Sequence, residues 1–563
     1  MRNTLPLFPR FRLRTVATRL ARDESGSLII LSLQIFLIML IVTGIAIDIV
    51  RQEERRIVIQ NTLDRAMLAA ADLNQSLDPA DVVQDYFAKS GLGHLTVTPI
   101  VKEGAFKEWR SVEATVTDTM PTIFGPLVGI TELHSPAQSR ATESIGNVEI
   151  SLVLDISGSM NDSVRKPDGK TTTRIALLRD AAQSFVDSMF KSVQPAGARP
   201  GKLSISVVPY NQQVVLGKNL AGLYNISADH TSSRTCVDLH TLSFDDLGIP
   251  ENTSLQRTMY GDSFDHTGNG WTRPTTASIQ NCPEATAAQV MAFANDQTKI
   301  KNKIKALTAD GDTAIDFGAK WGLALLDPSA RPVLDKMIAK DWASEDLSGR
   351  PFDYPNSNPT PEDVEAMKVL VLMTDGQNTR SYSTRPAYRS GPSGLVSTQG
   401  AEAIGTSSND KKLYYYDTAP ARASKPYYSF NDGKWYAADK VSGTKHQITY
   451  ETLWSKKNYS LQHVVWTYLG VPNNNRASLY ASMANESEFD DKDTNLRSIC
   501  AQANTSQHQI KIFTIAVDAP AEGREVLKDC ATSDAYFFPV NSADLGNAFA
   551  SIASAINALR LTN

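Results

Sequence analysis

Short apolar runs recur along the chain and are separated by amphipathic and polar stretches. The runs at 150–154, 203–209, 369–373 and 510–517 are rich in Val, Leu and Ile, as is typical of strands that are buried on both faces of a parallel sheet. The amphipathic segment 174–190 predicts a helix that covers such a sheet. This alternation predicts an α/β fold with a doubly wound, mostly parallel sheet.

Three polar stretches interrupt this pattern and are predicted to be insertions into the sheet domain, at about 211–309, 330–362 and 377–487. At the end of the first insertion, the segment 284–307 predicts a helix. The third insertion is rich in tyrosine, and its segment 412–436 predicts hairpin strands whose tyrosines pack on one another. Exposed aromatic side chains that bind a partner are the alternative interpretation.

Near the amino terminus, residues 28–47 form a run of 20 residues without a charge. At a rise of about 1.5 Å per residue, a helix of this length matches the hydrocarbon core of a bilayer. The preceding residues, 1–27, contain six arginines but only one aspartate and one glutamate. We therefore expect a single-pass transmembrane helix with its amino terminus in the cytoplasm. A cleaved signal peptide is the alternative, but the apolar run exceeds the usual length of its hydrophobic region.

The helical pattern continues beyond the apolar run, because apolar residues recur at helical spacing and form one stripe: Ile59, Leu63, Ala66, Ala70 and Leu73. Short strands are expected further along, at 95–101 and 111–117. Residues 48–145 are thus predicted to form a small module of one helix and a few strands.

Oxygen-bearing side chains gather at three positions in this pattern. Asp155, Ser157 and Ser159 directly follow the first apolar run, Thr313 precedes a further helical run, and Asp375 follows the third apolar run. Open α/β sheets bind their ligands outside the carboxyl ends of the strands. A set of carboxylates and hydroxyls suits a hard cation such as Mg²⁺. Plain turn and helix-capping chemistry is the alternative explanation.

The three loops together resemble the metal-ion-dependent adhesion site of von Willebrand factor A (VWA) domains: Asp-x-Ser-x-Ser, a downstream Thr, and Thr-Asp-Gly after a core strand. The resemblance implies a Rossmann-like fold and a bound Mg²⁺, Mn²⁺ or Ca²⁺ ion. In that family Ser157, Ser159 and Thr313 would touch the ion directly, while Asp155 and Asp375 would hold it mainly through water. Such an ion keeps much of its charge for an acidic residue offered by a protein partner.

Both ends of the chain resemble TadG-like assembly proteins of tight-adherence (Tad, or Flp) pili. At the amino end, the similar features are Gly26 before the apolar run and the Ala-rich stretch 66–72. At the carboxyl end, they are the segments 527–531, 536–538 and 559–561. The Ala-rich stretch departs from the Gln-x-Ala-x-Asp-Ala-Ala-Ala-Leu-Ala run that the family often carries.

This resemblance implies a cytoplasmic basic segment (1–27), a transmembrane helix (28–47), a pilin-like TadE/TadG-like module (48–145) and a VWA domain with insertions (146–563). It implies an inner-membrane protein whose bulk lies in the periplasm and which assembles or anchors a pilus. Its partners would be other pilus or secretion components. A surface adhesin with a VWA metal site, and a scaffold whose metal is only structural, are the alternatives.

The chain has four cysteines, an even number, and no two of them have the C-x-x-C spacing of a zinc or redox site. Outside the cytoplasm they are expected to form two disulfides, for which the sequence permits several connectivities. We favour Cys236 with Cys282 and Cys500 with Cys530, because each pair lies within one segment. Four buried free thiols are the alternative.

The net charge of -5 demands no basic face, so a nucleic-acid partner is not expected. The sequence contains no Gly-x-Ser-x-Gly elbow and no His-Glu-x-x-His motif, and its candidate residues do not form a nucleophile and base. We therefore expect a binding protein rather than an enzyme. Asp312, beside Thr313, is expected either to support the metal ligands from behind or to cap the helix that follows it, and we favour the cap.

Overall fold

The computed structural model describes residues 27–562, except for 74, 104–108, 145, 167–168, 231–234, 263–279, 284, 356–365, 402–403, 405–411 and 457–458. The basic segment predicted at 1–27 therefore falls almost entirely outside the described residues. The chain divides into two compact units, Met1–Ser144 and Ile145–Asn563.

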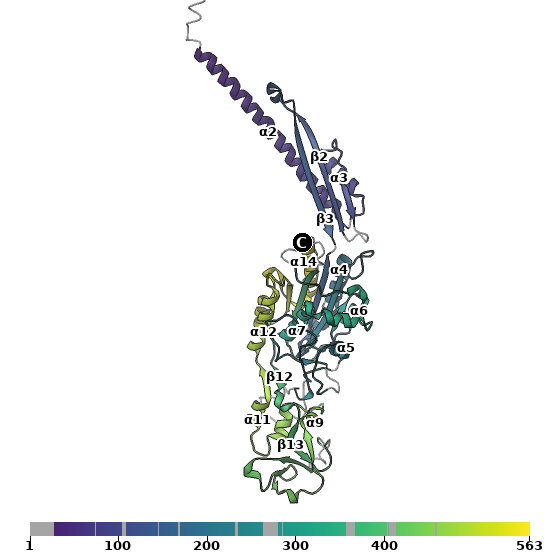
Figure 1. Cartoon of the computed structure of the whole chain (residues 1–563), viewed down its shortest axis with the longest axis vertical. Coiled ribbons are helices and arrows are strands. Elements are labelled where there is room, and N and C mark those ends of the chain that lie inside the picture. Colours follow the sequence, from purple (N-terminus) through teal and green to yellow (C-terminus); the bar gives the residue numbers. More distant parts are fainter. Residues whose placement is uncertain are drawn as a thin grey trace, which may run out of the picture. The chain divides into compact units, whose positions relative to one another are not determined.

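Helix α2, Ser27–Ala71, is the longest element of the first unit (Figure 1). It is long and apolar enough to cross a membrane, a test that a signal sequence near the amino terminus also passes. Towards its carboxyl end, Ile59, Leu63, Ala66 and Ala70 are fully buried. The predicted apolar stripe is thus confirmed up to Ala70, whereas Leu73 lies beyond the end of the helix.

A three-stranded antiparallel sheet, in the order β1-β2-β3, packs on this stripe. Alternate residues of β2, namely Val112, Ala114 and Val116, join α2 in one core. The strand predicted at 111–117 is confirmed as the middle of the longer strand β2. The strand predicted at 95–101 overlaps β1 only at residues 100 and 101. The bounds are Ile100–Glu103 for β1, Trp109–Pro121 for β2 and Glu132–Ser144 for β3.

Helix α3, Pro79–Lys89, is an element that the hydrophobic pattern did not predict. Its start nevertheless carries a recognisable signal. The side chain of Asp78 accepts a hydrogen bond from the Ala80 N–H. Pro79 takes the first helical position, where a backbone N–H would have no partner within the helix, so the N–H that proline lacks is not needed. The helix contributes three side chains to the core of the unit: Val82, Val83 and Phe87.

The second unit is built around a six-stranded sheet in the order β10-β7-β4-β11-β19-β20. Neighbouring strands are parallel except for β10, which runs antiparallel to β7. The sheet is therefore mixed, and the expected α/β class is confirmed. The bounds are β4 Asn147–Asp155, β7 Leu203–Tyr210, β10 Met291–Ala294, β11 Ala366–Thr374, β19 Lys511–Val517 and β20 Phe537–Val540.

Two groups of helices pack on this sheet (Figure 1). In the first group, α4 contacts both α6 and α14. In the second, α7, α12 and α13 share one core with Val153 and Leu370 of the sheet. Gly322 lets α7 approach the sheet closely, because an added Cβ would overlap Val153. The bounds are α4 Arg174–Val193, α6 Gln297–Lys305, α7 Ile315–Ala324, α12 Phe489–Ala503, α13 Ala521–Cys530 and α14 Leu545–Thr562.

The stretch predicted as the first insertion, at about 211–309, returns to the sheet earlier than expected. Within the helix predicted at 284–307, Met291–Ala294 is the edge strand β10, and only Gln297–Lys305 forms a regular helix, α6. The helical prediction is wrong in its first part because pairing with β7 holds β10 extended. Strand pairing is a tertiary contact that a local apolar pattern does not reveal.

The stretch predicted as the second insertion, at about 330–362, ties into the sheet through a buried ionic cluster. Arg350 lies 3.1 Å from Glu149 of β4, and Lys368 of β11 lies 2.6 Å from the same carboxylate. All three side chains are almost fully buried, so two cations share one carboxylate in the interior. The shorter elements of this unit are β5 Ser163–Arg165, β6 Thr171–Thr173, α5 Gly217–Ala221, β8 Val237–Asp238, β9 Gln256–Arg257, α8 Arg331–Ile338, α9 Tyr450–Trp454, α10 Leu461–Val464 and α11 Arg476–Met483.

The stretch predicted as the third insertion, at about 377–487, has a core of its own. Strands β12 and β18 near its two ends pair with each other, so the chain leaves and returns at one place. Between them lies a five-stranded sheet in the order β16-β15-β14-β13-β17. The tyrosines of the predicted hairpin do pack together, with the Tyr427 ring against Tyr414 and Tyr416. The bounds are β12 Ser381–Thr384, β13 Pro392–Ser397, β14 Leu413–Tyr416, β15 Tyr427–Ser429, β16 Trp435–Tyr436, β17 His446–Thr449 and β18 Ala484–Ser487.

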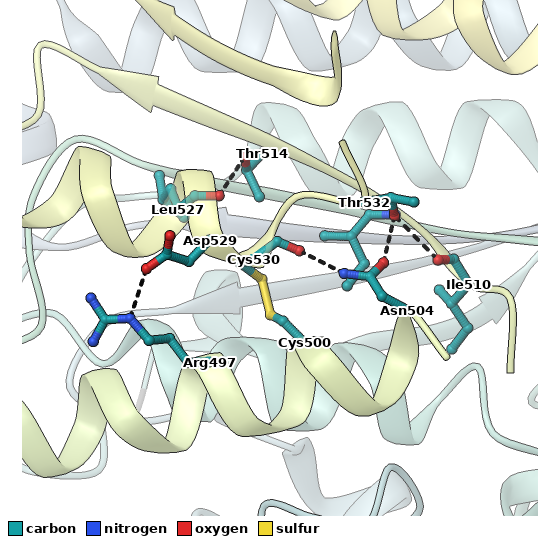
Figure 2. Close-up of a disulfide and its surroundings, with 10 residues drawn as sticks. Arg497, Cys500, Asn504, Ile510, Thr514, Leu527, Asp529, Cys530 and Thr532 are labelled. Atoms are coloured by element: carbon teal, nitrogen blue, oxygen red, sulfur yellow. Dashed lines mark hydrogen bonds and ion pairs between the residues drawn. A yellow bond between two sulfur atoms is a disulfide. The ribbon is translucent and has the colours of Figure 1, made fainter. Parts of the chain in front are cut away.

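The expectation of two disulfides is confirmed, and the bonds are Cys236–Cys282 and Cys500–Cys530. The second joins α12 to the end of α13 (Figure 2). Beside it, the Asn504 amide donates a hydrogen bond to the Cys530 carbonyl. An ion pair between Arg497 and Asp529, with a nitrogen–oxygen distance of 2.8 Å, links the same two helices.

Removing the Cys500–Cys530 bond is expected to lower the free energy of unfolding by about 3–4 kcal/mol, because the bridge restricts the unfolded chain. The variant is Cys500→Ser with Cys530→Ser, and the measurement is denaturant unfolding of residues 145–563 followed by tryptophan fluorescence. Arg497→Ala is the matched control, since it removes an exposed ion pair between the same helices and should cost under about 1 kcal/mol. Equal midpoints for the double variant and the unaltered chain would contradict this account.

Candidate metal site

The candidate site lies where two central strands end side by side. Strands β4 and β11 pair in parallel register, with Leu154 opposite Met373. Their last residues are Asp155 and Thr374, so Asp375 begins the adjacent loop. The strand order also reverses here, because β7 and β10 lie on one side of β4, while β19 and β20 lie beyond β11. Such a reversal opens a crevice at the carboxyl ends of the strands, where α/β sheets bind ligands.

The first loop turns back on the Asp155 carboxylate. One of its oxygens accepts a hydrogen bond from the Ser157 N–H at 2.7 Å, and the other accepts one from the Thr374 hydroxyl at 2.6 Å. The hydroxyls of Ser157 and Ser159 lie 3.1 Å apart, and Ser159 donates to Asp375 at 2.6 Å. The structure therefore brings four of the five predicted residues into one hydrogen-bonded cluster.

Thr313, the fifth predicted residue, lies in the loop before α7, and its hydroxyl is 3.6 Å from where a Cβ added at Gly376 would lie. The carbonyl of Gly311 in this loop accepts a hydrogen bond from the Gly158 N–H at 2.8 Å, which ties the first and second loops together. The Thr313 carbonyl accepts from the Thr379 N–H and hydroxyl, at 2.8 and 2.9 Å, which ties the second loop to the third. Thr313 is thus held between the other two loops.

The two carboxylates of the site are buried and close to each other. Burial, with a smaller contribution from the negative charge of Asp375, raises the pKa of Asp155 to about 7. Burial also raises the pKa of Asp375, although hydrogen bonds from Ser159 and Arg174 act in the opposite direction. Both shifts mean that the ionised pair is destabilised where it stands.

The opposite end of the same strand pair provides a contrast. There, the Glu149 carboxylate is matched by two cationic side chains, Arg350 and Lys368. At the site, the two donors to the Asp155 carboxylate are both neutral, and Asp375 receives one guanidinium, that of Arg174 at 2.9 Å. Buried charges in proteins are paired or coordinate metals. The site therefore has an excess of negative charge that a cation would offset.

The donor set fits a hard cation, because it offers two carboxylates and three hydroxyls: Asp155, Asp375, Ser157, Ser159 and Thr313. Oxygen ligands of this kind suit Mg²⁺ or Ca²⁺ rather than zinc or copper. Within the described ranges, no group of three or more His, Cys, Asp or Glu side chains is placed to hold a metal ion. A site of this composition depends instead on its hydroxyls.

Arg174 and Asn378 are two site residues that the sequence did not single out. Arg174, the first residue of α4, reaches back to Asp375 and also contacts Asp162 at 3.2 Å. Asn378 caps α7 by accepting the Ile315 N–H at 2.7 Å. The expectation that Asp312 caps this helix is therefore wrong, since the helix begins later than the loop suggests and its cap comes from another loop. Neither contact has a local sequence signal, because each joins distant segments.

No protein-family model and no curated protein sequence matches this chain. Among solved structures, the vWF domain of the type V pili tip protein Mfa5 from Porphyromonas gingivalis matches with 15% identity and a TM-score of 0.26, covering 73% of this chain and 96% of that one. The pilus adhesin SpaC from Lactobacillus rhamnosus GG matches with 10% identity and a TM-score of 0.26, covering 83% of this chain and 34% of that one. These likenesses are weak, and the function proposed below rests on the residues of this chain.

Gly311→Ala is expected to lower the free energy of unfolding by about 1–3 kcal/mol. Gly311 has a φ of +84°, and an added Cβ would overlap the side-chain oxygen of Gln212. Gly197→Ala is the matched control, because its φ is +91° but nothing lies within 4 Å of an added Cβ, so it should lose only about 1 kcal/mol. Denaturant unfolding measures both, and an equal loss in the two variants would show that the site loops tolerate the crowding.

Proposed function

We propose that this chain is a membrane-anchored, periplasm-facing protein that assembles or anchors a pilus, and that it recognises protein partners through a metal-ion-dependent adhesion site. The observation that carries the proposal is the meeting of three distant loops, with Asp155, Thr313 and Asp375 among their residues, at the carboxyl end of the central strand pair. These are the loops whose sequence resembles VWA domains of the TadG-like kind.

In this proposal Mg²⁺, or Mn²⁺ or Ca²⁺ in its place, supplies a positive charge that a carboxylate can bind. The hydroxyls of Ser157, Ser159 and Thr313 would hold the ion. Both oxygens of Asp155 already accept hydrogen bonds from protein donors. This supports contact between the carboxylate and the ion through water rather than directly. Because hydroxyl ligands are neutral, an acidic residue of a partner would complete the coordination.

The contacts within the site support binding rather than catalysis. A nucleophilic hydroxyl needs a base that takes its proton. The Ser157 hydroxyl pairs with another hydroxyl, that of Ser159, and the nearby Asp155 accepts the Ser157 backbone N–H. These contacts give the loop its shape, and they engage both oxygens of Asp155, one with the Ser157 N–H and the other with the Thr374 hydroxyl.

The proposed location rests on the charges around the apolar run and on the two disulfides. Residues 28–47 lack charge and are preceded by arginines, which favours an amino terminus in the cytoplasm and a single span of the inner membrane. The two disulfides lie in the part of the chain that would then face the periplasm, a compartment where disulfides persist. Other pilus or secretion components would be the partners there.

The metal site is tested by isothermal titration of Mg²⁺ and Mn²⁺ into chelator-stripped protein. The unaltered chain should bind one ion saturably, and Asp155→Ala with Ser157→Ala should weaken binding by about 100-fold or more, since the ion loses both a direct and an indirect ligand. Asp162→Asn is the matched control, because this exposed carboxylate contacts Arg174 but is not a predicted ligand, and it should bind normally.

Equal titration curves for the double variant and the unaltered protein would refute the metal site. A pilus component that binds both forms equally in Mg²⁺ would refute recognition through the metal while leaving the fold untouched.

A further inference from the structure

The tip of the β2–β3 hairpin is a folded apolar surface. Between Asp118 and Glu132 the chain carries no charged residue. Four large apolar side chains of this stretch stand in solvent: Ile123 and Leu127 are 60% exposed, Val128 is 45% and Ile130 is 43%. Contiguous exposed apolar surface of this kind marks a contact with a protein or a membrane.

The turn that presents these side chains is well built. Residues Gly125–Val128 form a 3-10 helix that ends at Gly129, which has a φ of +85°. The Ile130 N–H donates to the Gly125 carbonyl at 2.9 Å, and the Thr122 hydroxyl donates to the Ile130 carbonyl at 2.6 Å. The backbone bonds made within the tip leave its apolar side chains pointing outward.

Helix α2 pins this tip at one particular level. The Asp48 carboxylate accepts hydrogen bonds from three successive N–H groups of the tip, those of Ile123 at 2.9 Å, Phe124 at 2.7 Å and Gly125 at 2.9 Å. One helical turn earlier, Gly44 leaves room for the Phe124 ring, which would lie 2.5 Å from an added Cβ. Asp48 is only 2% exposed, and besides the three N–H groups of the tip its carboxylate contacts Arg51 at 3.5 Å.

Asp48 is also the first charged residue after the uncharged run 28–47. The tip is therefore attached to the last turn of the apolar segment and the first residue beyond it. If that segment fills the hydrocarbon core, the tip lies at the boundary between acyl chains and headgroups. Arg51 and Arg55 follow on the same helix and pair with Asp48 and Asp118. Each keeps more than a third of its side chain exposed, so its stem can extend along such a boundary.

We propose that the β2–β3 tip is a lipid-docking surface that inserts Ile123, Leu127 and Val128 into the outer face of the same bilayer that α2 crosses. This rests on the membrane anchor in the proposed function. Insertion is shallow, because a loop has backbone groups that hydrocarbon cannot satisfy, and apolar side chains at an interface reach only about 5–10 Å inward. With α2 it would give the first unit two points of contact with the bilayer and so limit its tilt.

The test uses the full chain reconstituted into phosphatidylcholine and phosphatidylglycerol vesicles, with an environment-sensitive fluorophore on one added cysteine. All four native cysteines are in disulfides, so only the added thiol reacts. The labelled positions are Leu127→Cys and Val128→Cys at the tip, Met39→Cys within the apolar run, and Thr115→Cys, an exposed position of β2 away from the tip. Lipids with nitroxide groups at shallow and deep acyl positions serve as quenchers.

Both tip labels should be blue-shifted and quenched by shallow nitroxides at least about twofold more strongly than the Thr115 label. The Met39 label should be quenched by deep nitroxides. If Met39 is quenched but both tip labels behave like Thr115, the tip faces water or a protein and the lipid-docking surface is refuted, while the anchor stands. If the Met39 label is not quenched, the anchor itself is refuted, and lipid docking with it.

Discussion

The parallel pairing of β4 with β11 is the contact on which the candidate site depends. Both strands are buried along nearly their whole length, and residues on the two strands face each other in one register from Ala366 opposite Asn147 to Met373 opposite Leu154. Register in a buried sheet is strongly specified, since a slip of one residue turns every apolar side chain to the wrong face. The positions of Asp155, at the end of β4, and of Asp375, directly after β11, are therefore set by the register of this strand pair.

The same strand pair separates two kinds of buried charge. At its amino end, the Glu149 carboxylate lies between two cations, Arg350 and Lys368, and this cluster joins a distant segment to the sheet. At its carboxyl end, Asp375 pairs with one guanidinium, that of Arg174, whereas the two hydrogen-bond donors to Asp155 are neutral. An unmatched buried charge is costly unless it binds a counter-ion. The excess of carboxylate at this end of the strand pair is the physical reason to expect a cation there.

The first unit uses one helix for two purposes. The earlier part of α2 is apolar on all sides and exposed, whereas its later part buries only the stripe that faces β2 and β3. Asp48 lies between the two parts and bonds the hairpin tip to the helix. This change in surroundings along one continuous helix is what the proposed membrane span requires.

The sequence by itself determined the apolar strands, most of the stripe of α2 and the oxygen-rich loops, because each depends on residues that are close in the chain. It favoured the two disulfides but left other pairings open, and the structure decided between them. It also named Asp155, Ser157, Ser159, Thr313 and Asp375 as one candidate set, through a motif spread over three loops. Only the tertiary structure decided that 291–294 is a strand, that Asn378 caps α7, that Arg174 meets Asp375 and that Asp48 holds the hairpin tip. These contacts join residues far apart in the chain, and a local pattern carries no information about which distant partner will satisfy a backbone group or a buried charge.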